Sequence, residues 1–199
     1  VAWTCSAVPP IPGELTPVEL QALAGASATL VSPDGAHVYA VGSTAATAGR
    51  LVGFSRETDA TSHLYGKLGF IEAFERDDTV RLGGAAALAL SPDGSHLYVA
   101  AAGDNAVLVF DRDQLPGSTD YGKLTFSAAL VDGAGGVAGV AGARALAVSP
   151  DGRHLYVAGA ADDALAVFER NTTSGALTFL ATVVDGAGGA DGLAGASGV

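Results

Sequence analysis

Short runs of alternating apolar and polar residues recur along the chain, with turn-forming residues between them. The clearest group covers residues 145–148, 154–158, 164–168 and 177–184. Alternation over about four to eight residues, bounded by Gly, Pro, Asn, Asp or Ser, is typical of a half-buried β-strand. This group therefore predicts four short strands joined by turns.

The tetrapeptide Ser-Pro-Asp-Gly separates the first two runs of that group and occurs three times. Its copies begin at Ser32, Ser91 and Ser149, which are 59 and 58 residues apart, and each continues as x-His-x-Tyr. Pro presets the backbone of a turn, and Gly adopts the left-handed conformation that lets the chain reverse. Self-similarity at a fixed period predicts one structural unit per repeat.

The other two copies carry the same four runs, and glycine-rich links and small residues separate the repeats. Four strands per unit, with small residues in the first and a longer returning link, describe a β-propeller blade. We therefore predict an all-β protein with three four-stranded antiparallel blades, at residues 23–81, 82–139 and 140–192. The runs of the first two copies are 29–31, 38–41, 51–54 and 68–71, then 88–90, 97–100, 107–110 and 124–126.

Both ends of the chain carry fragments of the repeat. Residues 13–18 align with a fourth strand, so we expect residues 1–22 to comprise an N-terminal extension and the end of a preceding blade, and residues 193–199 to begin a further blade. Because propellers close with about four to eight blades, the prediction is one domain that forms an open arc of a larger propeller, with an apolar blade face at each end. Either a longer polypeptide or an assembly of several chains would complete the arc.

The repeat is similar to that of a known family. Ser-Pro-Asp-Gly-x-His-x-Tyr-Val, Val-x-Val-Phe-x-Arg, Gly-x-Leu-Thr-Phe and Asp-Gly-x-Gly-Gly resemble the bacterial lactonase-like (YVTN-type) propeller repeats over residues 23–199. The resemblance implies a propeller, a fold that serves both enzymes and binding proteins. With the missing initiator Met and a single Cys, it also leads us to expect a periplasmic or extracellular protein.

Composition narrows the class of partner. The chain has 21 acidic and 10 basic residues, a formal net charge of −11, and its basic residues do not cluster. A nucleic-acid-binding surface needs a basic patch, so nucleic acid is not an expected partner. No apolar run approaches the ~20 residues of a membrane-spanning helix. Cys5 has no internal disulfide partner, so we expect either an inert thiol or half of an intermolecular bridge.

The polar residues that recur once per blade are expected to serve the scaffold. The histidines begin a strand after a turn and would lie too far apart to share a metal ion. The aspartates are explained by bonds to the turn backbone, and the arginines by a salt bridge or carbonyl contact at a strand end. The pattern thus assigns no catalytic residue and no organic cofactor. The three sets are His37, His96 and His154; Asp34, Asp93 and Asp151; and Arg56, Arg112 and Arg170.

Asp132, Asp185 and Asp191 are the candidate metal ligands. They belong to the glycine-rich links, where carboxylates and carbonyls together could hold Ca²⁺, which takes about six to eight oxygen ligands. Their spacing matches neither an EF-hand loop nor a calcium β-roll, and such a link needs no ion. Calcium is therefore the weaker of the two interpretations.

A second acidic set falls between the second and third strands. Asp162 and Asp163 occupy the place of Asp104 and Asn105 in the preceding copy. Loops of this kind gather on one face of a propeller, so these acids could line its mouth. A solvated turn is the simpler interpretation.

Two functions stay open. The first is a non-enzymatic interaction or structural module, as a subunit or portion of a larger assembly, whose open blade faces contact a protein partner or the remaining blades. The alternative, implied by the resemblance, is a lactonase-like hydrolase acting on a sugar lactone. We favour the module because an enzyme breaks repeat symmetry at the central mouth, whereas here the asymmetry falls in outer loops. The clearest difference lies in the loop between the third and fourth strands. The spacing from the Phe before this loop to the Phe after it is 16 residues in two copies and 11 in the third.

Overall fold

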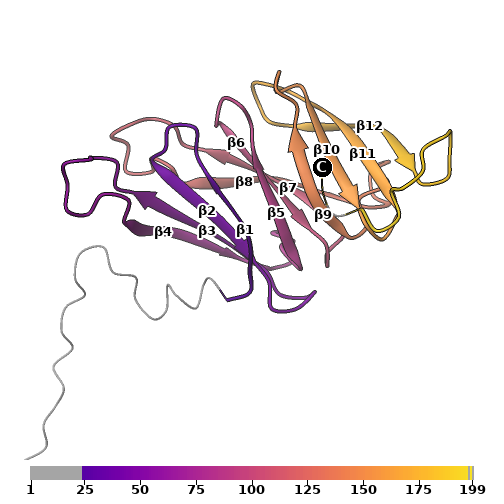
Figure 1. Cartoon of the computed structure of the whole chain (residues 1–199), viewed down its shortest axis with the longest axis horizontal. Helices are drawn as coiled ribbons and strands as arrows, with labels where there is room; N and C mark the ends of the chain where they lie inside the picture. Colours follow the sequence, from indigo (N-terminus) through magenta and orange to yellow (C-terminus); the bar gives the residue numbers. More distant parts are fainter. Residues whose placement is uncertain (1–23, 197, 199) are drawn as a thin grey trace, which may run out of the picture.

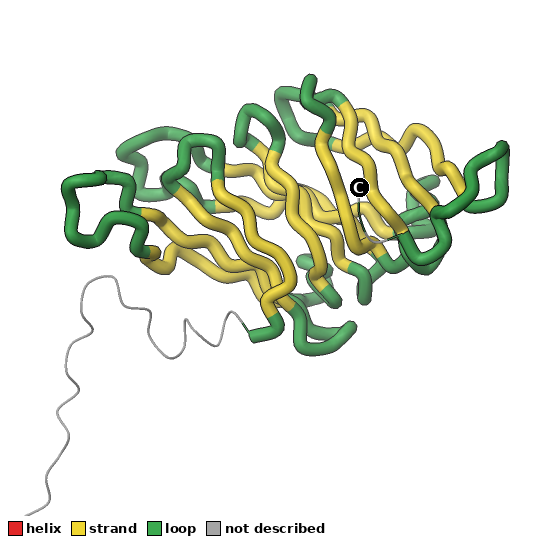
Figure 2. Tube along the Cα trace, in the orientation of Figure 1, coloured by secondary structure: helices red, strands yellow, loops and turns green. Residues whose placement is uncertain are grey.

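The computed structural model describes residues 24–196 and 198, and within them the chain forms strands and loops without a helix (Figure 2). Three four-stranded sheets lie side by side like the blades of a fan (Figure 1). The first blade contains β1 (Ala26–Val31), β2 (His37–Gly42), β3 (Arg50–Arg56) and β4 (Leu68–Glu75); the second β5 (Ala85–Leu90), β6 (His96–Ala101), β7 (Ala106–Arg112) and β8 (Leu124–Val131); the third β9 (Ala143–Val148), β10 (His154–Gly159), β11 (Ala164–Arg170) and β12 (Leu177–Val184).

Every sheet has the same order and the same register. Each strand pairs antiparallel with the next strand in sequence, and a bulge recurs between the third and fourth strands, at Gly53/Phe54, Val109/Phe110 and Val167/Phe168. The inner strands β1, β5 and β9 pack against one another in succession. The predicted all-β propeller with three antiparallel blades is confirmed, and it is an open, partial propeller.

The Ser-Pro-Asp-Gly turn forms as the sequence predicts. In the second blade Gly94 has φ of 71°, and the carboxylate of Asp93 accepts a hydrogen bond from the backbone N–H of Ser95 at 3.0 Å. The Ser91 hydroxyl accepts a further bond from the backbone N–H of His96, also at 3.0 Å. The tetrapeptide thus satisfies its own backbone and delivers the following His to the start of β6.

Two apolar layers fill the spaces between the blades. Phe110 lies between Phe74 of the first blade and Phe126, with ring centroids 5.1 Å and 5.6 Å away. Phe168 occupies the matching place between the second and third blades and is fully buried. Burying one such side chain stabilises the fold by about 1.5–3 kcal/mol, so the blades are held together mainly by these layers.

The structure describes only part of the two predicted partial blades. Residues 13–18 lie outside the described residues, as does Cys5. At the other end, Ala196 donates to the carbonyl of Leu193 at 2.9 Å, and the same turn precedes β5 and β9. The proposed blade boundaries and the start of a further blade stay predictions. In the part of the chain that the structure describes, no helix is long and apolar enough to cross a membrane.

Candidate functional site

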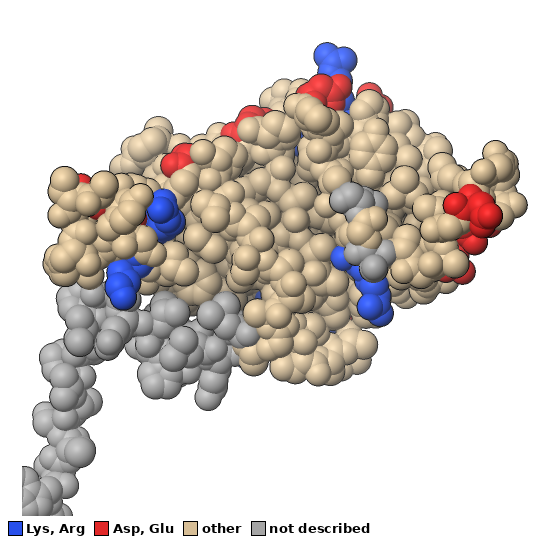
Figure 3. All heavy atoms as spheres, viewed as in Figure 1, with Lys and Arg blue, Asp and Glu red and all other residues tan. Residues whose placement is uncertain are grey.

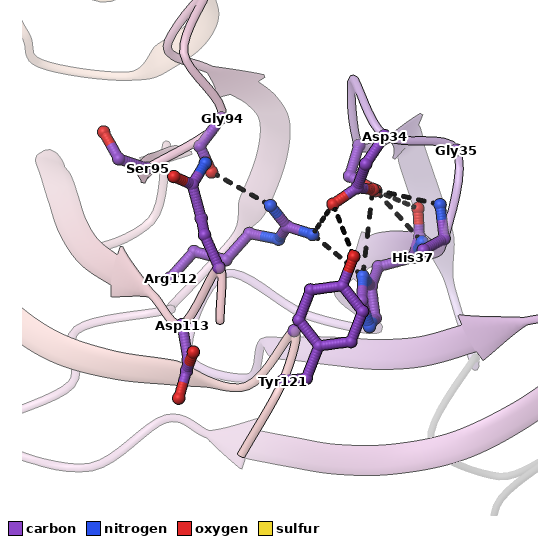
Figure 4. Close-up of polar contacts among 12 residues, drawn as sticks. Asp34, Gly35, His37, Gly94, Ser95, Arg112, Asp113 and Tyr121 are labelled. Atoms are coloured by element: carbon purple, nitrogen blue, oxygen red, sulfur yellow. Dashed lines mark hydrogen bonds and ion pairs between the residues drawn. The ribbon is translucent and has the colours of Figure 1, made fainter. Parts of the chain in front are cut away.

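A cluster of polar side chains joins the first blade to the second (Figure 4). Arg112, at the end of β7, reaches across to the turn and second strand of the first blade. Its guanidinium donates to Asp34 Oδ2 at 2.6 Å, to the Tyr39 hydroxyl at 2.9 Å and to His37 Nδ1 at 2.8 Å. The Tyr121 hydroxyl also donates to Asp34, at 3.2 Å. We call this set the junction cluster.

The same cluster recurs between the second and third blades. Arg170 donates to the Tyr98 hydroxyl at 2.6 Å and to His96 Nδ1 at 2.7 Å, and it lies 3.7 Å from Asp93. The Tyr98 hydroxyl in turn donates to the carbonyl of Gly175 at 2.9 Å. The recurring His, Tyr, Asp and Arg are therefore brought together at these two junctions, where Arg112 and Arg170 each meet the His and Tyr of the blade before their own.

The charges and pKa shifts of the junction cluster favour a stable contact between the two blades. Burial would raise the pKa of Asp34, but hydrogen bonds from Ser32 and Arg112 hold that pKa well below its usual range. Burial and the adjacent Arg112 charge lower the pKa of His37, and burial raises the pKa of Tyr39 to about 12. Because arginine can only donate, His37 accepts through Nδ1 as a neutral ring. No buried side-chain nitrogen or oxygen of the described residues lacks a hydrogen-bond partner, so the polar groups of the cluster satisfy one another.

Stability is expected to fall as the pH drops below about 6.5. Burial lowers the folded-state pKa of His37 and His96 below their ordinary value of 6.5, so the unfolded chain takes up protons first as the pH falls. This contribution is fully present above pH 6.5. We expect a lower urea midpoint at pH 5.0 than at pH 7.5, and a smaller difference in the double variant His37→Asn, His96→Asn. Equal midpoints for the unaltered chain would contradict the prediction.

A hollow of about 580 Å³ lies at the opposite end of the inner strands from the Ser-Pro-Asp-Gly turns. Three kinds of segment meet there: the β2–β3 loop, the start of β5 and the β6–β7 loop. One side chain of β9, Arg144, completes the lining and also borders an adjoining hollow of about 420 Å³. The residues of the first hollow are Ser43, Thr44, Ala45, Ala46, Gly84, Ala86, Ala102, Gly103 and Arg144.

Arg144 breaks the repeat symmetry of this hollow. Its counterparts one residue into the inner strands are Ser27 and Ala86. The Ser27 hydroxyl donates to the backbone carbonyl of Ala85 at 3.0 Å, whereas the Arg144 side chain is exposed. We expected equivalent positions of the three blades near the centre to carry similar residues. That expectation is wrong at the position of Ser27, Ala86 and Arg144. The signal was present in the sequence, because the other copies have Ala-Ser and Ala-Ala where this one has Ala-Arg.

The acidic loop residues near this hollow fasten the links between blades. Asp104 forms an ion pair with Arg76 at 2.9 Å, and only 9% of its side chain is exposed. Asn105 and Asp162 accept backbone N–H groups of the link ahead of β9, and Asp163 accepts one from Gly195 at 2.7 Å. These side chains lie at the predicted end of the blades, but they cap backbone groups instead of pointing into the hollow.

The candidate calcium ligands also serve the links. Asp132 accepts a hydrogen bond from the backbone N–H of Val140 at 3.2 Å, and Asp185 accepts two, from Gly192 at 2.8 Å and Leu193 at 2.7 Å. Among the described residues, no three His, Cys, Asp or Glu side chains gather as a metal site would require. The geometry gives Asp132 and Asp185 backbone partners, and calcium at Asp132, Asp185 and Asp191 stays a prediction.

The comparisons with known proteins concern this same repeat. A family model described as "Lactonase, 7-bladed beta-propeller" matches residues 70–190, more than half of the chain. The chain belongs to this lactonase propeller family. No curated protein matches it.

Solved structures agree with the family. A candidate 6-phosphogluconolactonase from Bacteroides fragilis superposes with a TM-score of 0.63 and 25% identity, over 81% of this chain and 40% of the other. The periplasmic gluconolactonase of Pseudomonas aeruginosa gives 0.62 and 28%, over 79% and 39%. A Swd1 propeller domain from Myceliophteria thermophila, at 17% identity and a TM-score of 0.53, shows the fold alone. The chain thus spans about 40% of the length of the two lactonase structures.

Membership of the lactonase family gives the hollow a place in the fold. In a closed propeller the inner strands surround a central channel, so the hollow lined by Ala86 and Arg144 lies on the side of the sheets that would border such a channel. Most of the surface over the inner strands carries neither acidic nor basic side chains (Figure 3). Among the residues that line the hollow, Arg144 contributes an exposed guanidinium, a group that can donate hydrogen bonds to an anionic or polarised ligand group.

Proposed function

We propose that this chain supplies three blades of a lactonase-type propeller that hydrolyses a sugar lactone, with Arg144 at the channel mouth. The observation that carries the proposal is the break in symmetry at Arg144. Among the described residues that line the hollow, it is the one with a charge, and the others are Ser, Thr, Ala and Gly. The family match and the two gluconolactonase neighbours support a lactone as the substrate class.

A guanidinium suits the electrophilic end of this reaction. When water adds to the lactone carbonyl carbon, the carbonyl oxygen gains negative charge; the ring C–O bond then breaks and leaves a hydroxy acid. Preorganised N–H donors stabilise such an oxygen more than they stabilise the neutral carbonyl. Arginine stays protonated and cannot take the proton of the attacking water. The proposal therefore assigns Arg144 to charge stabilisation and places the general base on another part of the propeller.

The non-enzymatic module is the competing function. Its support was the regularity of the repeats, and the junction cluster does account for the recurring polar residues as scaffold. The argument from symmetry no longer favours it, because Arg144 departs from the repeat at the channel mouth. The proposed location is periplasmic or extracellular, and one of the two neighbours is a periplasmic gluconolactonase.

Replacing Arg144 tests the proposed reaction. We expect the intact protein to hydrolyse glucono-δ-lactone above the spontaneous rate, and Arg144→Ala to lower kcat/KM at least about tenfold, as the loss of a hydrogen bond from a charged group implies. The measurement is a pH-indicator assay of acid release. Arg153→Ala is the control, because that exposed arginine lies at the opposite end of β9.

Three results would count against lactone hydrolysis at this mouth. Hydrolysis no faster than the spontaneous reaction would favour the module, as would a partner recovered in stoichiometric amount. Equal activity of Arg144→Ala and the unaltered protein would show that Arg144 is not part of the active site.

Repeating the assay with EDTA tests calcium at Asp132, Asp185 and Asp191. Activity lost with EDTA and restored by Ca²⁺ would support a bound calcium ion.

A further inference from the structure

The loop between β2 and β3 differs in length from its equivalents in the other two blades. It covers residues 43–49, seven residues, whereas the β6–β7 and β10–β11 loops cover 102–105 and 160–163, four residues each. We call it the long loop. Its residues 43–46 line the hollow that Arg144 completes. The hollow therefore combines two departures from the repeat, a longer loop from the first blade and an arginine from the third.

The long loop is shaped by bonds within itself. The Ser43 hydroxyl donates to the carbonyl oxygens of Ala45 and Ala48, the first at 2.5 Å. The backbone N–H of Ala48 donates to the Ala45 carbonyl at 3.0 Å. A side chain that bonds to nearby backbone groups fixes the local turn. The loop thus has a defined course before it reaches the second blade.

Two glycines of the second blade make room for the middle of the long loop. A Cβ atom built on Gly103 would lie 1.9 Å from the Ala46 carbonyl oxygen, and one built on Gly83 would lie 2.7 Å from it. Neither glycine has a positive φ, so the close approach of the Ala46 backbone is what requires them. Nearby, the backbone N–H of Gly84 donates to the Ala48 carbonyl at 2.9 Å.

The third blade has alanines at the places of these two glycines. Gly103 N–H donates to the Gly83 carbonyl at 2.9 Å, and Ala161 N–H donates to the Ala141 carbonyl at 3.0 Å, so the two pairs are equivalent. The preceding blade supplies the long loop to the first pair and a short loop to the second. Glycine therefore occurs where the long loop docks, and alanine occurs where no such loop arrives.

Asp104 fastens the second-blade side of this contact. Its carboxylate accepts a hydrogen bond from the backbone N–H of Gly83 at 2.8 Å and pairs with Arg76 at 2.9 Å. The long loop thus docks onto a link that is itself held in place. A wall that is already ordered loses little conformational freedom when a ligand binds, so it suits selective binding.

The wall that the long loop gives the hollow carries hydroxyl and methyl groups. The Ser43 hydroxyl bonds within the loop, whereas the Thr44 side chain is exposed at the lining of the hollow. A threonine hydroxyl can both donate and accept a hydrogen bond, as the hydroxyl groups of a sugar do. Arg144 contributes the charge of the same lining.

We propose that the long loop determines the specificity of the hollow, with Thr44 contacting a hydroxyl group of the ligand while Arg144 contacts its carbonyl or carboxylate group. The inference rests on the proposed function, which places a lactone in this hollow. The ligand class is a polyhydroxylated lactone or the hydroxy acid that its hydrolysis yields. A lactone without hydroxyl groups cannot make the bond to Thr44, so the loop favours the hydroxylated one.

Two lactones with the same six-membered ring test the role of Thr44 in the intact protein. Glucono-δ-lactone carries hydroxyl groups, and δ-valerolactone carries none. Thr44→Val should lower kcat/KM for glucono-δ-lactone about three- to tenfold, as the loss of one hydrogen bond implies, and leave that for δ-valerolactone unchanged. Arg144→Ala should lower both. Thr47→Val is the matched control, because Thr47 is exposed in the same loop, of which only residues 43–46 line the hollow.

Gly103→Ala tests the seat of the long loop. It gives the second blade the residue that the third blade has, and its Cβ should displace the Ala46 carbonyl. The preference for glucono-δ-lactone over δ-valerolactone should fall at least about threefold, from the hydrogen bond lost at Thr44. Partial unfolding lowers both activities alike and leaves this ratio unchanged. Ala161→Gly, the reverse change at the equivalent place, is the control.

The outcomes distinguish the loop from the reaction. Unchanged ratios in Thr44→Val and Gly103→Ala, with Arg144→Ala still impaired, would overturn the role of the loop and leave lactone hydrolysis standing. An equal fall for both lactones in Thr44→Val would also overturn it. If neither lactone is hydrolysed, calorimetric titration with gluconate decides. Binding weakened by Thr44→Val but not by Thr47→Val would support the loop although the reaction fails, and binding that is absent or insensitive to Thr44→Val would overturn it.

Discussion

Arg112→Ala is expected to lower the free energy of unfolding by about 3 kcal/mol. The variant removes the shared donor of Tyr39 and His37 from a buried junction and leaves Asp34 without its cation. Breaking one side of a buried ion pair costs about 3–5 kcal/mol, and the lower end applies because 35% of the Asp34 side chain remains in contact with water. The apolar layer around Phe110 should keep the blades assembled. The measurement is the urea midpoint and slope at pH 7.5.

Arg56→Ala is the matched control for this prediction. Arg56 has the same place in its own blade, at the end of β3, but its guanidinium contacts a carbonyl and a ring of that blade alone. A half-buried hydrogen bond within one blade contributes about 0.5–1.5 kcal/mol. The two variants are compared at the same low protein concentration. Equal destabilisation by the two substitutions would show that junction contacts contribute nothing beyond the local role of the arginine.

The strands were predictable because local chemistry determines them. Short apolar runs between turn residues mark the strands, but the expected burial of one face is wrong for the middle strands, because all six residues of β6 are buried between neighbouring blades. Ser-Pro-Asp-Gly forms its turn with its own side chains, whatever lies beyond it. The position of each strand within its blade was also predictable, because Ser-Pro-Asp-Gly lies between the first and second strands of every blade. The register is the same in all three sheets, as expected when one pattern is repeated.

The junction cluster was not predictable from these patterns. Arg112 lies 73 residues from Tyr39 along the chain, and a period alone does not say which blade's tyrosine an arginine reaches. The sequence predicted a salt bridge or a carbonyl contact at a strand end for each arginine, without indicating which blade supplies the partner. The carbonyl contact exists, since Arg112 also donates to the carbonyl of Gly94 at 3.3 Å, but it is the minor part of what the residue does.

Arg144 was missed for a different reason. Small residues dominate the inner strands, and their row was explained by crowding at the centre of a propeller. That explanation holds for Ala86 and Ser27, and it hid the one large charged side chain in the row. A comparison of the copies column by column, instead of motif by motif, would have separated Arg144 from its counterparts.

Gly175→Ala is expected to destabilise the third blade by about 2–5 kcal/mol. Gly175 has φ of 69°, and a Cβ there would lie 2.1 Å from Cδ2 and 2.5 Å from Cγ of His96. The imidazole cannot easily move aside, because Nδ1 is held by Arg170 and His96 is only 5% exposed. A positive φ costs alanine about 1–2 kcal/mol, and overpacking a filled site adds about 1–3 kcal/mol.

Gly133→Ala separates these two costs. Gly133 has φ of 73°, nearly the same as Gly175, but a Cβ built there meets nothing within 4 Å. Its substitution should therefore cost only the backbone term of about 1–2 kcal/mol. The difference between the two urea midpoints, measured at the same pH and with equal slopes, reports how tightly the loop ahead of β12 is pressed onto His96. A difference near zero would mean that the loop can move away from His96 at little cost. Tyr98 and Arg170 would then maintain the junction without the hydrogen bond from Tyr98 to the Gly175 carbonyl.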